Sequence, residues 1–291
     1  MTFRSLTITC FTIFAMLSPC IANGDASGLT SLPQAHSTAD SSVPAQKPEG
    51  PAPVAATPPP QEPTLSEMRA MTASQLDEEG DRLRQAKDYL GALDCYHEAV
   101  HKQPTAGYYN KIAISQLMLR HPAEAAKAAK KAVRKDKHMA EAWNNLAVTY
   151  YMRNKFDDAI RTYQRAISLQ PGFASFHNNL AAVYMDSKQF DLAFAEYRKA
   201  FELDPLFFES ASQNGISARM GSPQDRAQFF FVMARLFAGS GDLDRSLHFL
   251  RGAIEDGYPK IDDVYHDKEF ARAIADERFV ALLKDRPVSV R

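Results

Sequence analysis

From about Ser66 onward, apolar side chains recur at the spacing of one face of an α-helix. The clearest stretch is 140–173, where Trp143, Leu146 and Tyr150 stand at i, i+3 and i+7 and share one side of a first helix. A second helix follows, whose apolar face consists of Phe156, Ala159, Tyr163 and Ala166. This pattern predicts two helices that pack against each other as a hairpin.

The hairpin pattern returns with a period of about 34 residues. The next copy, 174–207, matches the first in register and closes with a proline in the same way. Two earlier copies span 73–105 and 106–139, and the second of these has Lys137 in place of the closing proline. We therefore expect consecutive helical hairpins from residue 73 onward.

The register breaks after Pro205, which predicts a degenerate copy over 208–226. Ser222 and Pro223 then suit the N-cap and first position of a new helix, and a weaker copy occupies 227–260. Short amphipathic pieces in 261–291 are expected to cover the end of the array; their apolar residues are Phe270, Ala271, Ile274, Phe279, Val280 and Leu283. No segment has the alternation of a β-strand, so the predicted fold class is all-α.

These copies resemble the tetratricopeptide repeat family, and the resemblance spans most of the chain from residue 65 to residue 260. It implies a right-handed superhelix, an α-solenoid, whose first helices line a concave groove that binds other polypeptides. It implies neither a cofactor nor a catalytic site. The expected function is that of a non-catalytic scaffold for a protein or peptide partner.

The N-terminal region differs from the repeats. Residues 1–22 combine a basic start, a short apolar run and small residues, which is typical of a secretory signal and too short for a permanent membrane span. The segment before Cys20 also resembles a lipoprotein signal, so Cys20 is either removed or carries a lipid anchor. Residues 23–64 are rich in proline and lack periodicity, which predicts a disordered linker. We therefore expect an extracytoplasmic protein of the bacterial envelope, periplasmic or secreted.

The overall charge gives no reason to expect nucleic acid as a partner, because 34 basic residues balance 35 acidic ones. One predicted helix does carry a run of basic residues, namely Lys127, Lys130, Lys131, Arg134, Lys135 and Lys137. Alanines alternate with them and no aromatic residue is interleaved, which favours a solvated convex face over a patch for an anionic partner.

The segment His97-Glu98-Ala99-Val100-His101 matches the zinc-hydrolase motif H-E-x-x-H. A zinc-dependent hydrolase is therefore the alternative function. The repeat register, however, gives the core positions to Tyr96 and Ala99, and turns both histidines and Glu98 to the solvated side. His177 and Cys95 are interpreted as packing residues rather than as a ligand and a reactive thiol.

The resemblance implies which residues face the groove. In the three central copies the predicted groove residues are Asn110, Lys111, Leu117, Met118, Asn144, Asn145, Val148, Tyr151, Met152, Asn178, Asn179 and Met185. The apolar members are expected to stay outside the core. Asn145 and Asn179 resemble the row of asparagines with which some members of the family bind the backbone of an extended peptide. The alternative is that both residues only solvate the inner face. The family's clamp for chaperone carboxyl termini needs lysine and asparagine where this chain has Asp77 and Asp81.

Overall fold

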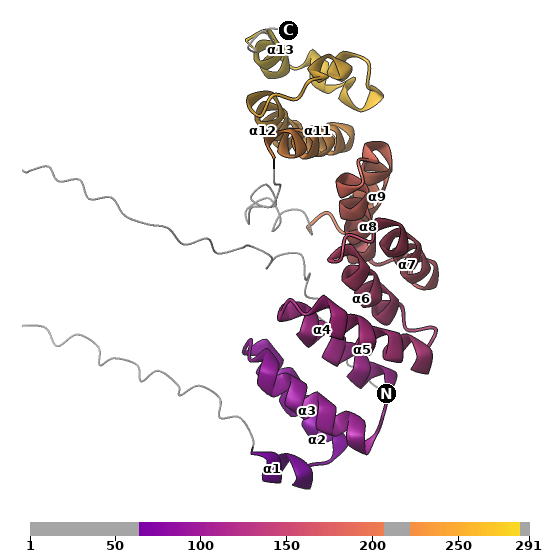
Figure 1. The fold of residues 1–291 in the computed structure, drawn as a ribbon. Helices are drawn as coiled ribbons and strands as arrows, with labels where there is room; N and C mark the ends of the chain where they lie inside the picture. Colours follow the sequence, from indigo (N-terminus) through magenta and orange to yellow (C-terminus); the bar gives the residue numbers. More distant parts are fainter. Residues whose placement is uncertain (1–63, 207–221, 286–291) are drawn as a thin grey trace, which may run out of the picture. The chain divides into compact units, whose positions relative to one another are not determined.

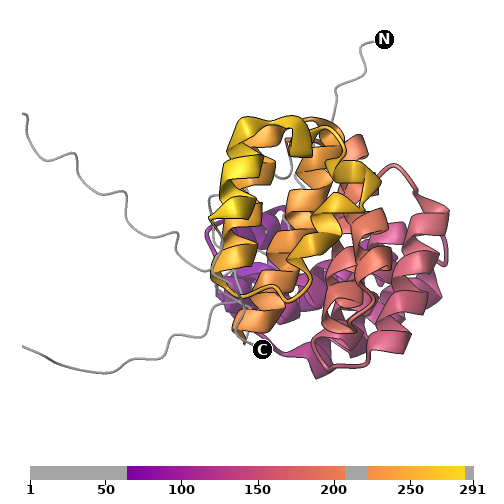
Figure 2. The same ribbon diagram turned by 90° about the horizontal axis from the view of Figure 1, so that it is seen from above.

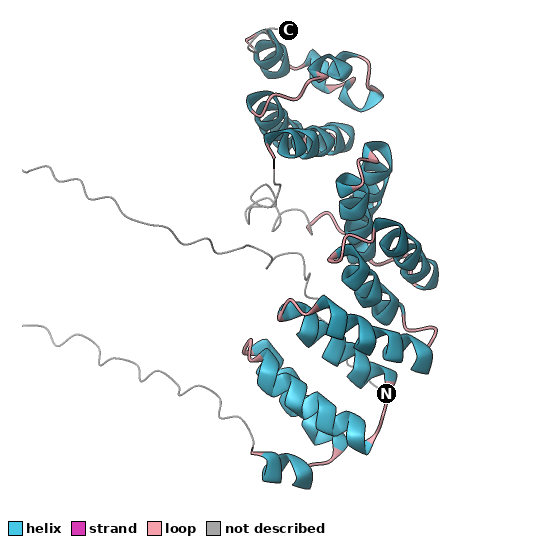
Figure 3. Cartoon of the chain, viewed as in Figure 1, coloured by secondary structure: helices cyan, strands magenta, loops and turns pink. Residues whose placement is uncertain are grey.

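The computed structural model describes residues 64–206 and 222–285, and within these ranges every regular element is helical (Figure 3). The predicted signal at 1–22, the linker up to residue 63 and most of the degenerate copy at 208–226 lie outside the described residues. Thr64 was assigned to the linker, but it is the N-cap of the first helix and forms a capping box with Glu67.

Consecutive helices pack in pairs (Figure 1). The pairs are α2 (Ala73–Gln85) with α3 (Tyr89–Lys102), α4 (Ala106–Met118) with α5 (Pro122–Lys135), α6 (Ala140–Tyr151) with α7 (Phe156–Leu169), α8 (Ala174–Asp186) with α9 (Phe190–Leu203), and α11 (Pro223–Ser240) with α12 (Leu243–Glu255). The short helix α1 (Leu65–Ala70) packs on α3. The described part is therefore an all-α array of helical hairpins.

The turn inside each of the first four pairs contains one residue in the left-handed region. These residues are Lys87, Arg120, Asn154 and Lys188, with φ of 65°, 61°, 55° and 63°. Each turn closes with backbone hydrogen bonds to the end of the preceding helix; for example, His121 N donates to Gln116 O at 2.8 Å. None of the four is glycine, although glycine adopts this conformation at the lowest cost.

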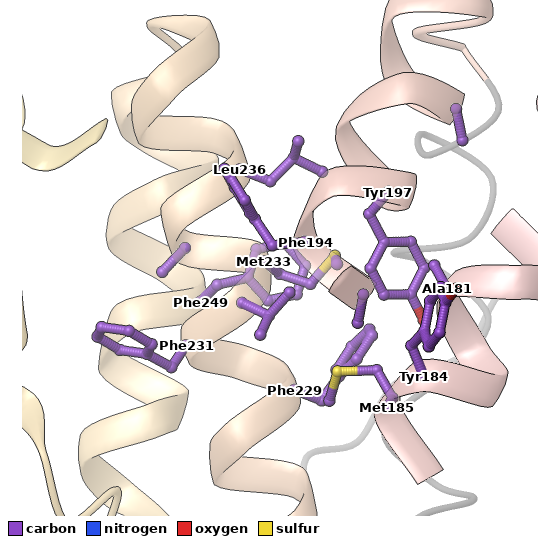
Figure 4. Packing of buried hydrophobic residues seen from close by; sticks show 14 of the residues in the cluster. Ala181, Tyr184, Met185, Phe194, Tyr197, Phe229, Phe231, Met233, Leu236 and Phe249 are labelled. Carbon is purple, nitrogen blue, oxygen red and sulfur yellow. The ribbon is translucent and has the colours of Figure 1, made fainter. Parts of the chain in front are cut away.

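The core fills the spaces within and between the pairs. Its largest fully buried side chains include Tyr96, Tyr163, Phe176 and Phe237, while alanines bring the paired helices close together. Around α9 and α11 the core is aromatic, as Figure 4 shows. Tyr197 meets Phe229 edge-on at 6.2 Å, and Phe237 stacks on Phe249 at 5.4 Å.

The helix α11 begins earlier than the predicted copy at 227–260. Ser222 is its N-cap and accepts a hydrogen bond from Asp225 N, as its sequence position indicates. The copy boundary at residue 227 thus falls inside α11, because the cap and the proline start the helix before the repeat pattern resumes.

The chain beyond α12 packs on the last pair (Figure 2). It forms the short 3-10 helices η3 (Ile261–Tyr265), η4 (Lys268–Phe270) and η5 (Ala273–Ala275), and then α13 (Glu277–Lys284). Phe270, Phe279 and Leu283 are buried, as predicted. Ala271 and Val280 are exposed instead, because the 3-10 geometry and the short α13 present only one narrow face to α11 and α12. No helix in the described ranges has the length and apolar character needed to cross a bilayer.

Candidate peptide-binding groove

The predicted groove residues lie on α4, α6 and α8, the first helices of three successive pairs. These helices contact one another directly, α4 with α6 and α6 with α8. Side chains one repeat apart in sequence therefore become lateral neighbours. The candidate site is formed by the contacts between equivalent positions of α4, α6 and α8.

Four asparagines from the three helices form a chain of hydrogen-bonded amides. Asn179 Nδ2 donates to Asn144 Oδ1 at 3.1 Å, and Asn144 Nδ2 donates to Asn145 Oδ1 at 3.3 Å. Asn145 Nδ2 donates in turn to Asn110 Oδ1 at 2.8 Å. Asn110, Asn144 and Asn145 are buried, whereas Asn179 is half-buried. The amides therefore join the three helices to one another, in addition to lining the predicted groove.

The opening pair contributes an acidic end to this row. Lys111 Nζ lies 2.6 Å from Asp77 Oδ1 and 2.8 Å from Asp81 Oδ2. Tyr96 Oη also donates to Asp81, at 2.7 Å. Burial raises the pKa of Asp81, but the hydrogen bonds from Lys111 and Tyr96, together with the charges of Lys111 and Arg84, hold that pKa below its ordinary value. Lys111 was predicted as a groove residue; its charge is already neutralised by α2.

A tyrosine links the other end of the row. Tyr151 Oη donates to Asp186 Oδ2 at 2.6 Å, which joins α6 to the last residue of α8. Burial and the nearby Asp186 carboxylate both raise the pKa of Tyr151, so the phenol stays protonated and remains a donor. This contact was not predicted.

The expectation that the apolar groove residues stay outside the core is wrong for three of them. Leu117, Val148 and Met185 are buried and belong to the main core. Their burial comes from packing between neighbouring helices, which a single-helix pattern cannot show. Asn178 is also buried. The half-buried groove residues are Lys111, Met118, Tyr151, Met152 and Asn179.

The H-E-x-x-H segment lies on α3 with its two histidines exposed. Tyr96, directly before the segment, and Ala99 within it take the core positions, as the repeat register predicts. Among the described residues, no group of three or more His, Cys, Asp and Glu side chains is placed to hold a metal ion. The segment therefore has the surroundings of an ordinary repeat helix.

His177 and Cys95 are packing residues, as predicted. His177 is buried, with Nδ1 2.7 Å from Glu196 Oε2 and Nε2 3.1 Å from the Pro171 carbonyl oxygen. Cys95 is fully buried against Met68, and burial raises the pKa of its thiol to about 11.

The basic residues on α5 are exposed, as expected, but two of them have aromatic neighbours on other helices. Lys130 Nζ lies 5.8 Å from the centre of the Tyr150 ring, and Lys131 Nζ lies 5.3 Å from that of Tyr109. The rings belong to α6 and α4, so inspection of α5 alone could not find them.

A family comparison agrees with the geometry. The models of the tetratricopeptide repeat match residues 140–173 and 174–207, which contain α6 with α7 and α8 with α9. The chain is a tetratricopeptide-repeat protein. The matched ranges coincide with the two copies that carry the clearest sequence pattern.

Several solved structures resemble this tetratricopeptide array over part of its length. A thermophilic tetratricopeptide protein of Thermus thermophilus is 19% identical, covers 73% of this chain and 100% of its own, and has a TM-score of 0.46. PilF of Pseudomonas aeruginosa is 17% identical, with 73% and 89% covered and a TM-score of 0.47. The first tetratricopeptide domain of Spaghetti (RPAP3), bound to an HSP90 peptide, is 21% identical, with 40% and 94% covered and a TM-score of 0.39. No curated protein matches the chain.

Proposed function

We propose that this protein is a non-catalytic scaffold that binds an extended segment of a partner protein along α4, α6 and α8. Tetratricopeptide arrays are protein-interaction modules, and this one carries a continuous row of amides across three first helices. That row is the observation on which the proposal rests. Half-buried Met118, Tyr151 and Met152 supply apolar contact beside it.

The amides keep capacity for a ligand. A side-chain amide has two N–H donors and an oxygen that accepts two hydrogen bonds. Within the row of amides, Asn145 donates one hydrogen bond and accepts one. One N–H and one acceptor position of its side chain therefore remain. Asn179 is more accessible and donates once. A peptide main chain offers both a carbonyl and an N–H, and can use these positions without a fixed sequence.

The test starts from peptides selected for binding to the purified protein from a random peptide library. The best peptide is titrated against wild type and against the double variant Asn145→Ala with Asn179→Ala. Loss of two amide contacts is expected to weaken binding by roughly tenfold or more. The same peptide with N-methylated backbone amides should lose affinity for wild type, because main-chain donors are then blocked.

Asn145 is buried, so the double variant needs a control for lost stability. Ser246→Ala is a suitable control. Ser246 lies on α12, where its buried Oγ donates to the Ala234 carbonyl oxygen of α11 at 2.7 Å, so the contact belongs to a pair outside the proposed groove. It should lower stability and leave peptide affinity unchanged. Equal binding by the double variant and wild type would show that the asparagines only join the helices, and that partners bind elsewhere.

We also propose that the protein acts outside the cytoplasm, in the bacterial envelope. The proposal rests on the signal-like pattern of residues 1–22. Mass spectrometry of the protein recovered from expressing bacteria tests it. An N-terminus at Asn23 is expected for simple secretion, and one at a lipid-modified Cys20 for an anchored form; an intact Met1 in cytosolic protein would refute export.

A further inference from the structure

A pocket of about 570 Å³ lies between α5 and α6, away from the amide row. Its apolar lining comes from both helices and consists of Val133, Trp143, Leu146 and Tyr150. These side chains are buried or half-buried, so the apolar surface is recessed rather than protruding. The indole of Trp143 is fixed there, since its Nε1 donates to the Lys137 carbonyl oxygen at 3.0 Å.

The other lining residues are basic: Lys127, Lys130, Lys131 and Arg134, all exposed on α5. Within the described residues none of the four has a recorded carboxylate partner, whereas cations such as Lys111 and Arg226 do. Lys127 and Lys131 are four residues apart on α5, and so are Lys130 and Arg134, which places the members of each pair one helical turn apart. Like charges at this spacing repel each other and destabilise a helix. A bound anion would remove that repulsion.

We propose that this pocket is a second binding site, for an acidic segment of a partner protein that carries a large apolar side chain. The apolar side chain enters the recess against Trp143 and Tyr150, and flanking carboxylates pair with the four cations. Charge complementarity selects this occupant. An anionic membrane surface fits less well, because membrane binding requires apolar side chains that protrude.

The pocket is separate from the proposed groove. On α6 the pocket residues are Trp143, Leu146 and Tyr150, whereas the amides are Asn144 and Asn145. With 3.6 residues per turn, the two sets point to roughly opposite sides of the helix. One molecule of this protein can therefore bind a segment in the groove and another in the pocket at the same time. Failure of either proposal leaves the other intact.

The full chain contains one tryptophan, so Trp143 reports on this pocket without a label. The probe is a short synthetic peptide in which one leucine is flanked by glutamates, titrated at low ionic strength while tryptophan fluorescence is followed. A saturable change is expected. The same peptide with glutamine for glutamate, or with serine for leucine, should bind at least about tenfold more weakly, because each lacks one half of the recognition.

Variants locate the site. Lys130→Glu with Arg134→Glu should weaken binding by roughly tenfold or more, since both cations line the pocket. Lys135→Glu with Lys137→Glu makes the same change in net charge beside the pocket and should retain most of the affinity. Lys130→Gln with Arg134→Gln tests the cations without adding acidic groups. Circular dichroism confirms that each variant is folded.

Three outcomes would overturn the proposal. The first is equal loss of affinity in the two charge-reversed variants, which would indicate general attraction between opposite charges. The second is no saturable fluorescence change with the leucine peptide. The third is binding to phosphatidylglycerol vesicles without binding to the peptide, which would assign the basic side chains to a lipid surface.

Discussion

Asn179 donates a hydrogen bond to Asn144 across 3.1 Å, although 35 residues separate them in the chain. The same separation joins Asn145 to Asn110 and Tyr151 to Asp186, and a separation of 34 joins Lys111 to Asp77. Each contact connects equivalent or adjacent positions of neighbouring first helices. The repeat period therefore sets which polar side chains meet between the pairs.

Asn145→Ala should destabilise the array by about 1–3 kcal/mol, because the amide is buried and has a partner on each side. Its removal leaves Asn110 Oδ1 and one N–H of Asn144 without those partners. Urea unfolding followed by circular dichroism measures the change.

Asn179→Ala is the matched comparison for that prediction. Asn179 is half-buried and stands at the end of the amide chain, where its recorded hydrogen bond is the donation to Asn144. Its loss should cost less than the loss of Asn145. An equal or larger cost would mean that the chain of amides contributes little beyond ordinary side-chain packing.

The helices themselves follow from the sequence. Trp143, Leu146 and Tyr150 define one face of α6, and alanines at fixed spacing mark where α7 approaches it. Ser222 and Pro223 mark the start of α11 to the residue. Local caps and the 3.6-residue period are properties of a single segment, so the sequence contains them directly.

Contacts between first helices are less accessible to this reasoning. A helical pattern assigns Val148 to the groove side of α6, but its burial depends on how closely the neighbouring helices lie beside α6. The same limit hid the rings of Tyr109 and Tyr150 from the interpretation of the lysines on α5. Such contacts depend on the spacing between helices, which the period of one helix does not encode.

The left-handed turn residues give a second prediction. Arg120 has φ of 61°, and an L-residue pays for this conformation while glycine does not. Arg120→Gly should stabilise the protein by about 0.5–1 kcal/mol. This is the net effect, after the greater freedom that glycine gives to the unfolded chain is subtracted. Arg120→Ala keeps the unfavourable conformation and should bring no gain. Thermal unfolding of both variants beside wild type checks this; equal midpoints for glycine and alanine would contradict it.

The buried thiol gives a third. With the pKa of Cys95 raised to about 11 by burial, roughly a thousandth of it is ionised near about pH 8. In a variant with Cys10→Ser and Cys20→Ser, a thiol reagent should therefore label the folded protein slowly. Labelling should accelerate when urea unfolds the first pairs. Rapid stoichiometric labelling of folded protein would show that the α2–α3 core opens readily.

The last prediction concerns acid stability and rests on Asp81. Against the opposing effect of burial, the pKa of this carboxyl is held below its reference value of 3.8 by hydrogen bonds from Lys111 and Tyr96 and by the charges of Lys111 and Arg84. A carboxyl with a lower pKa in the folded state stabilises the fold fully above the unfolded pKa, and loses that stabilisation as the pH falls through the folded pKa. Asp81→Asn should therefore cost about 1 kcal/mol at neutral pH, a modest value because the pair is partly exposed to solvent. The difference in unfolding midpoint between variant and wild type should then shrink as the pH falls below 3.8. Glu79→Gln is the control, since Glu79 pairs with Arg82 on the same helix and not with α4. A gap between Asp81→Asn and wild type that stays constant down to the lowest pH would mean that Asp81 acts through packing, and that its charge does not join α2 to α4.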